Sequence, residues 1–242
     1  MKLRPLIRVC LSTVLIPQFK VEDYVVVVID ILRATTSFAV ALHRGASEVR
    51  PVPSLRACRA LRKQGYLTAA ERGAQKVPGF DFGNSPYDFL EADLQGKKLA
   101  ITTTNGTKAL WAVRGAKKVV TGAFVNMSAL LHWLRQQDEP ILLVCAGWKD
   151  QVNMEDTLFA GAVATELEGD FRVNDDATLI AMSLYQLAEH RKKYYLEHSA
   201  HFDRLVELGM QQDVKYCLRR DLHPVLPFYR DGTLVDLLSV QV

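Results

Sequence analysis

Apolar residues recur along the chain in patterns that predict alternating strands and helices. The clearest run is Val25–Ile29, where five consecutive β-branched residues indicate a strand buried on both faces, as in a parallel sheet. Residues 141–145 predict a second strongly apolar strand. Further strands are expected at residues 6–14, 48–52, 67–70, 99–102 and 118–121.

Helices are expected between these strands, at residues 37–43, 55–63, 107–113, 127–135 with Asn126 as the cap, and 155–167. After residue 175 the pattern predicts helices at residues 176–190, 196–208 and 213–218, followed by a hairpin at residues 225–237. This order implies βαβ crossovers and a three-layer α/β/α fold with a mainly parallel, mixed sheet. We expect one α/β domain over residues 1–242, or two closely packed α/β subdomains.

Composition and charge limit the partners and the cellular compartment that we expect for this protein. The chain has 242 residues, 49% of them hydrophobic, and a formal net charge of only +3. Because its basic residues are interspersed with acidic ones, we expect no nucleic-acid partner. No apolar run is long enough to cross a bilayer, so we expect no membrane partner. The four cysteines form no close pair, which argues against a zinc ribbon and fits a reducing cytoplasm.

The first candidate for chemistry follows the run Val25–Ile29. Asp30 and Arg33 come directly after it, and the hydroxyl residues Thr35 and Thr36 stand where a helix should begin. Ligands of open α/β sheets bind at the carboxyl ends of strands, and helix N-termini attract anions. The alternative is that Thr35 or Thr36 only caps the helix while Arg33 pairs with a surface acid.

The second candidate also lies between a strand and a helix. Its hydroxyl, amide and basic groups suit an oxyanion, although the spacing of a Walker loop is absent. The residues are Thr103, Thr104, Asn105, Gly106, Thr107 and Lys108. The alternative is a tight turn with a threonine cap.

Two further groups supply acids and a long loop. Glu155 and Asp156 begin a helix after the segment 145–147, although the helix dipole alone favours acids there. Glu71 and Arg72 end a strand, and the loop that follows carries Asn84 and Ser85. Such a loop suits a lid or a ligand clamp, or it is a surface loop whose polar side chains bond their own backbone.

The histidines add no further candidate site. His198 and His201 lie three apart on an expected helix, but no third ligand has suitable spacing. We therefore expect surface or structural roles for both histidines.

The motifs of other hydrolases and nucleotide enzymes are absent from the sequence. No cysteine precedes an arginine at the spacing of cysteine phosphatases, and there is no DxDx[TV], GxSxG or GxGxxG segment. The remaining chemistry is carboxylates, cations and helix starts, which suits phosphate esters. Hard oxygen ligands without a His/Cys cluster favour Mg²⁺ over zinc.

The chain resembles the 2-phosphosulfolactate phosphatase family in several motifs that occur in the family's order. They are residues 29–36, 71–73, 79–86, 102–107, 145–147 and 155–156, with Tyr216-Cys217 near the end. The resemblance implies an α/β fold peculiar to the family, a homo-oligomer, and a Mg²⁺-dependent hydrolase. The implied reaction converts 2-phospho-3-sulfolactate into sulfolactate and phosphate, which serves coenzyme M biosynthesis in methanogens.

The candidates from the residue pattern and the resemblance together give a set of expected roles. Asp30, Glu71 and Asp156 are the expected metal ligands, with Glu155 as an alternate, and Asp30 is alternatively a nucleophile. Arg33, which we also expect to act in catalysis, forms one anion site with Thr35 and Thr36. The other anion-binding residues expected are Arg72, Asn84, Ser85, Thr103, Thr104, Asn105, Gly106, Thr107 and Lys108.

One segment departs from the family pattern. After Gly147 we expect a small loop containing glycine, whereas this chain has Trp148-Lys149-Asp150-Gln151. A bulkier, charged loop beside the site keeps two alternatives open. One is the same hydrolysis of another small phosphorylated hydroxy acid, and the other is a non-catalytic anion-binding protein.

Overall fold

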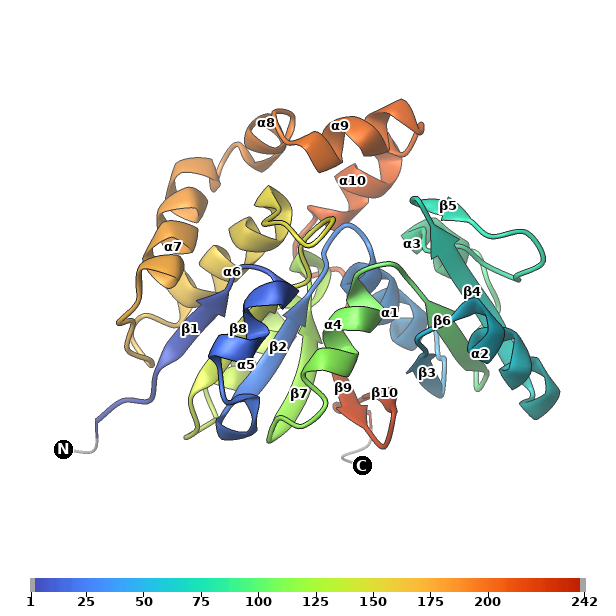
Figure 1. The fold of residues 1–242 in the computed structure, drawn as a ribbon, viewed down its shortest axis with the longest axis horizontal. Coiled ribbons are helices and arrows are strands. Elements are labelled where there is room, and N and C mark those ends of the chain that lie inside the picture. The colour runs from blue at the N-terminus through green and yellow to red at the C-terminus, as the bar shows by residue number, and fades with distance from the viewer. Residues whose placement is uncertain (1–2, 240–242) are drawn as a thin grey trace.

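Strand β2 (Val25–Ile29) is an interior strand of the sheet, and every one of its residues is fully buried. In the computed structural model, which describes residues 3–239, β2 pairs in parallel with β7 (Lys118–Gly122) and β8 (Ile141–Cys145). β8 in turn pairs in parallel with β1 (Ile7–Cys10). Helices cover both faces of this sheet (Figure 1), which explains why β2 and β8 are continuous apolar runs.

A second parallel set lies at the other end of the sheet. It consists of β3 (Glu48–Pro51), β6 (Lys98–Thr102) and β4 (Tyr66–Arg72), with β6 in the middle. The short strand β5 (Gln75–Lys76) extends β4 in antiparallel fashion.

A hairpin from the C-terminal part of the chain joins the two sets. Its strands are β9 (Pro227–Arg230) and β10 (Thr233–Asp236). β9 pairs antiparallel with β7, and β10 pairs antiparallel with β3. Within the described residues the result is one ten-stranded sheet in the order β1-β8-β2-β7-β9-β10-β3-β6-β4-β5. The expectation of an α/β fold with a mainly parallel, mixed sheet is confirmed.

Residues 3–239 contain ten α-helices. They are α1 (Ala34–His43), α2 (Leu55–Ala60), α3 (Pro86–Leu90), α4 (Gly106–Ala112), α5 (Met127–Leu134), α6 (Met154–Glu166), α7 (Asp176–Ala188), α8 (Lys192–Leu196), α9 (Ala200–Glu207) and α10 (Gln211–Cys217). Short 3₁₀ helices occur at Thr13–Gln18, Val21–Asp23, Leu61–Gln64 and Phe124–Asn126. Side chains of Ser54, Asp175 and Ser199 cap α2, α7 and α9 by accepting backbone N–H groups. No helix in the part of the chain described here has both the length and the apolar character needed to span a bilayer.

Several expected boundaries are wrong for local reasons. The first strand ends at Cys10, and a 3₁₀ helix containing Pro17 begins at Thr13, within the expected strand. The expected helix 196–208 is interrupted, because the Ser199 hydroxyl accepts the Phe202 N–H and starts a new helix. The Asn126 side chain accepts the N–H of Ala123 and does not cap α5.

Two other boundaries change the candidate site. Helix α1 begins at Ala34 and not at residue 37, so Thr35 and Thr36 lie in its first turn. β4 continues through Glu71 to Arg72 and turns back into β5, so the expected loop 72–86 begins with a tight hairpin.

Candidate active site

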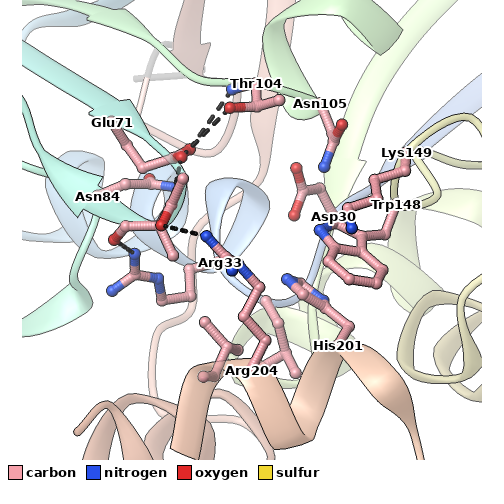
Figure 2. A pocket seen from close by; sticks show the side chains of 14 residues that line it. Asp30, Arg33, Glu71, Asn84, Thr104, Asn105, Trp148, Lys149, His201 and Arg204 are labelled. Atoms are coloured by element: carbon pink, nitrogen blue, oxygen red, sulfur yellow. Dashed lines mark hydrogen bonds between the residues drawn. The ribbon is translucent and has the colours of Figure 1, made fainter. Parts of the chain in front are cut away.

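A cavity of about 370 Å³ opens where the ends of four strands meet helix α9. The ends of β2, β4, β6 and β8 form its walls, and α9 brings side chains from the C-terminal part of the chain (Figure 2). The lining residues are Asp30, Leu32, Arg33, Glu71, Gly73, Ala74, Asn84, Thr104, Asn105, Trp148, Lys149, His201, Arg204 and Leu205.

Asp30 is the acid at the end of β2, and its side chain is almost completely buried. The main chain of α1 holds it in place: Oδ1 accepts the N–H of Ala34 at 3.4 Å. The Thr35 hydroxyl accepts the Asp30 N–H at 3.2 Å, so this hydroxyl is used within the turn. Burial raises the pKa of Asp30 from 3.8 to about 6, against an opposing influence of His201. Burial therefore favours the protonated form of Asp30 more than it is favoured in an exposed aspartate.

Gly106 allows the start of α4 to approach Asp30 closely. A Cβ atom at this position would lie 2.5 Å from the Cβ of Ala34 and 2.9 Å from Oδ2 of Asp30. Any side chain would therefore push α4 away from α1. The small size of Gly106 permits this close packing, and Gly106 itself does not line the cavity. Its neighbours Asn105 and Thr104 do.

The partly buried His201 pairs with the fully buried Glu155 beside Asp30. Nδ1 of His201 bonds Oε1 of Glu155, which also accepts an N–H from the Asn153 side chain at 2.9 Å. The His201 ring stacks on Trp148, with ring centroids 5.2 Å apart and planes 22° apart. Figure 2 shows the imidazole of His201 below the carboxylate of Asp30. The pairing through Nδ1 and the stacking fix the ring and leave Nε2 to hydrogen-bond a ligand.

Asp156 lies next to Glu155 in sequence but has a different environment. Its Oδ1 accepts the N–H of Ile31 at 2.9 Å, and Oδ2 accepts the N–H of Gly147 at 3.3 Å. It thereby ties the loops after β2 and β8 together. Burial and the nearby carboxylates Asp30 and Glu155 raise its pKa well above the usual range. Asp156 does not line the cavity.

Arg33 lines the cavity, but its guanidinium is engaged elsewhere. It forms a buried ion pair with Asp213 and donates to the backbone oxygen of Ala74. The Ser85 hydroxyl, expected in the cavity wall, donates to the other oxygen of Asp213 at 2.8 Å. Arg33 and Ser85 therefore connect the strand ends to α10, which carries Asp213.

Glu71, at the end of β4, and Asn84, in the loop between β5 and α3, face the cavity from the side of the second parallel set. Glu71 accepts the N–H of Ala74 at 2.7 Å and the hydroxyl of Thr104 at 3.2 Å (Figure 2). Asn84 is only 5% exposed, and its Oδ1 has no hydrogen-bond partner within the described residues. A buried acceptor without a partner is uncommon, so Asn84 is suited to meet a ligand.

Other expected anion-binding residues lie outside this cavity. A neighbouring cavity of about 380 Å³ is lined in part by Arg72, Thr103, Thr107 and Lys108. The Thr107 N–H donates to the Thr103 hydroxyl at 3.2 Å, while Lys108 pairs with Asp150 at the surface. Thr36 is also turned inward, because its hydroxyl donates to the Ile31 carbonyl at 3.0 Å.

The oxygen donors of the cavity fit a hard cation that is only partly held by protein. Within residues 3–239, no three His, Cys, Asp or Glu side chains are grouped so that they could hold a metal ion together. Asp30, Glu71 and the unpartnered Oδ1 of Asn84 nevertheless line one cavity. Mg²⁺ commonly uses one or two carboxylates and completes its shell with water and substrate oxygens. These donors suit such a site, whereas Asp156 is occupied by backbone N–H groups.

The contribution of α9 is not predicted by the sequence analysis. His201 is expected to have only a surface or structural role, and Arg204 is not among the expected site residues. Both line the cavity, and their i, i+3 spacing places them on one face of the helix. The sequence does contain one signal for this face of α9: His201 and Arg204 each directly precede an apolar residue, Phe202 and Leu205, and both apolar residues are buried.

Comparisons with known proteins identify one family. Residues 10–232 match the family model described as 2-phosphosulpholactate phosphatase. A protein of Thermotoga petrophila named "Probable 2-phosphosulfolactate phosphatase" is 37% identical over 226 residues, covering 93% of this chain and 97% of the relative. Proteins with the same name are 37% identical in Caldanaerobacter subterraneus subsp. tengcongensis, over 86% of this chain and 88% of the relative, and 38% identical in Synechocystis sp., over 83% and 87%.

Proposed function

The chain belongs to the 2-phosphosulfolactate phosphatase family, a family of phosphoric monoester hydrolases, and we propose that it hydrolyses 2-phospho-3-sulfolactate to 3-sulfolactate and phosphate. The observation that carries the proposal is the cavity around Asp30. A buried carboxyl group faces the imidazole of His201 there, and Lys149 and Arg204 line the same cavity.

The charges of the cavity support a small, strongly anionic substrate. The proposed substrate carries a phosphate, a sulfonate and a carboxylate, which are three groups that bind cations. Lys149 and Arg204 contribute positive charge, and the amide of Asn105 adds a neutral donor. Electrostatic stabilisation by such groups is a major source of rate enhancement in phosphoryl transfer.

Asp30 is proposed as the essential acid, with two roles that experiment can separate. As a nucleophile, its carboxylate would attack phosphorus, form an aspartyl phosphate, and release the sulfolactate oxygen, which takes up a proton. Water would then release phosphate and restore the acid. As a cation ligand, Asp30 would instead help to orient the phosphate for direct attack by water. Nε2 of His201 would hydrogen-bond a phosphoryl oxygen in either case.

We propose Mg²⁺ as the cofactor, held by Asp30 and Glu71 with Asn84 nearby. The ion would neutralise phosphate charge and polarise the phosphorus–oxygen bonds. Calorimetric titration with Mg²⁺ tests this assignment without turnover. Glu71→Gln should weaken binding, whereas Glu91→Gln, a control at an exposed acid just after α3, should leave it unchanged. Equal affinities for the wild type and Glu71→Gln would contradict the assignment.

The decisive experiment measures phosphate release by purified protein with Mg²⁺ and with EDTA. The substrate panel is 2-phosphosulfolactate, 2-phospholactate and the phosphoglycerates. Asp30→Asn should abolish turnover, while Asp203→Asn, an exposed acid on α9, should retain it. Acid quenching of wild type with labelled substrate separates the two roles, because only the nucleophile role leaves phosphate bound to Asp30. No release from any compound would refute the proposed activity.

A related substrate is the second candidate, and the loop after β8 is the reason. Trp148 lines the cavity and stacks on His201, while the Lys149 ammonium lies 4.2 Å from the centre of the Trp148 ring. A bulky aromatic wall favours a small phosphorylated hydroxy acid of matching shape. Faster Mg²⁺-dependent release from 2-phospholactate than from 2-phosphosulfolactate would favour this alternative.

We also propose that the protein acts in the cytoplasm as a homo-oligomer. The four cysteines are free and buried, which is compatible with a reducing compartment. Light scattering coupled to gel filtration measures the oligomeric state, and a monomeric mass at micromolar concentration would refute that part.

A further inference from the structure

Arg204 is the arginine of the cavity whose guanidinium is least engaged by the protein. Arg33 is held by Asp213 and the Ala74 carbonyl, and it is only 4% exposed. Arg204 has a single hydrogen bond among the described residues, from Nη2 to the Gly73 oxygen at 3.3 Å. The remaining N–H groups of its guanidinium are available to a ligand.

The hydrogen bond of Arg204 places its guanidinium beside the turn between β4 and β5. In Figure 2 the carboxylate of Asp30 lies above the imidazole of His201, with Lys149 on the same side of the cavity as Asp30, and we place the phosphate beside these three side chains. Arg204 reaches the turn between β4 and β5, where it contacts Gly73. A ligand with one anionic group at Asp30 would therefore present a second group to Arg204.

On the basis of the proposed function, we infer that Arg204 binds a non-reacting anionic group of the substrate, a carboxylate or a sulfonate, and so sets specificity for phosphate esters that carry a second anion. A guanidinium binds such planar or tripodal oxyanions with two parallel hydrogen bonds. Its position on α9, three residues after His201, links recognition of this group to the position of the imidazole.

An alternative role for Arg204 is purely structural. In that case its bond to the Gly73 carbonyl would hold α9 on the turn, and its loss would affect all substrates alike. Substrate dependence separates the two roles. Isopropyl phosphate has the branched carbon of the proposed substrate but neither carboxylate nor sulfonate, and 2-phospholactate has the carboxylate alone.

The test compares wild type, Arg204→Gln, Arg204→Lys and the control Arg56→Gln, which changes an exposed arginine on the distant helix α2. We expect Arg204→Gln to lose about 10- to 100-fold in kcat/KM on 2-phosphosulfolactate, the range for losing a hydrogen bond between charged groups. An equal loss on 2-phospholactate would identify the carboxylate as the group that Arg204 binds, and an unchanged value there would identify the sulfonate. The loss on isopropyl phosphate should stay below about threefold, because that ester lacks the group that Arg204 binds. Arg204→Lys should recover part of the loss, and Arg56→Gln should match wild type.

Binding of 3-sulfolactate, followed by calorimetry, provides a readout that needs no turnover. Its affinity should fall by a similar factor in Arg204→Gln and stay unchanged in Arg56→Gln. Equal losses on all three esters, or unchanged sulfolactate affinity in Arg204→Gln, would overturn the inference. If wild type releases no phosphate from any ester, the proposed function fails, but the sulfolactate titration still decides the role of Arg204.

Discussion

Replacing Gly161 by alanine should destabilise the protein by forcing α6 and α7 apart. Gly161 lies within α6, and a Cβ atom there would lie 1.9 Å from the carbonyl oxygen of Ala181 on α7. It would also lie 2.4 Å from the carbonyl carbon of that residue. Because these atoms belong to the backbone, no side-chain rotation can relieve the clash. One helix must therefore shift away from the other.

The expected cost follows from two opposing effects. Overpacking of this kind destabilises a core by roughly 1–3 kcal/mol or more, and a clash with backbone belongs at the upper end. Alanine recovers about 1 kcal/mol because its helix propensity exceeds that of glycine. We therefore expect a net loss of about 2 kcal/mol. In a chain of this size, that loss corresponds to a fall in Tm of roughly 4–8 °C.

The assay is denaturant unfolding followed by circular dichroism, with Gly169→Ala as the matched control. A Cβ atom at Gly169 would have no neighbouring atom within 4 Å, and the residue does not have a positive φ. We expect its free energy of unfolding to change by less than about 0.5 kcal/mol. If Gly161→Ala is as stable as wild type or more stable, the close contact between α6 and α7 is refuted.

Three further predictions concern buried groups. Asp213→Asn leaves the buried guanidinium of Arg33 without its charge partner. The free energy of unfolding, measured by denaturant titration, should therefore fall by about 3 kcal/mol. An unchanged midpoint would contradict this prediction. Burial, with smaller contributions from His43 and Arg219, lowers the pKa of His223 from 6.5 to about 4, so only the unfolded state gains this proton as the pH falls from 6.5 towards 4. Stability should therefore decline over that window, and His223→Asn should show a smaller decline in the same titration. Burial raises the pKa of the Cys10 and Cys58 thiols to about 11 and that of Cys217 to about 12. Native protein should therefore react with a thiol reagent far more slowly than unfolded protein. Rapid labelling of the native protein at neutral pH would contradict the burial of these thiols.

Local sequence pattern is enough to predict the strands of the two parallel sets. β2 and β8 are buried on both faces, and that environment requires continuous apolar residues, which are visible in the sequence. The position of the hairpin β9–β10 is not visible there. Leu234 pairs with Val49, and no local property of either residue specifies a partner so far away in the chain.

The candidate site is predicted only in part, because the same residue types serve two purposes. A hydroxyl or an acid near a helix start can bind a ligand or satisfy backbone N–H groups, and the sequence is the same in both cases. Asp30, Glu71 and Asn84 face the cavity, whereas Thr35 and Asp156 bond the main chain. The place of His201 in the site depends on how α9 packs over the strand ends, which no local pattern specifies.

The place of the β9–β10 hairpin has a consequence for how the chain folds during synthesis. Residues 227–236 join β7 to β3, so the two parallel sets cannot become one sheet until these residues have left the ribosome. Until then β7 and β3 each present an unpaired edge, which is open to association with other chains. A chain that stops short of the hairpin would retain both edges permanently. We expect such a product to depend on chaperones and to aggregate, even though it would contain every residue that lines the cavity.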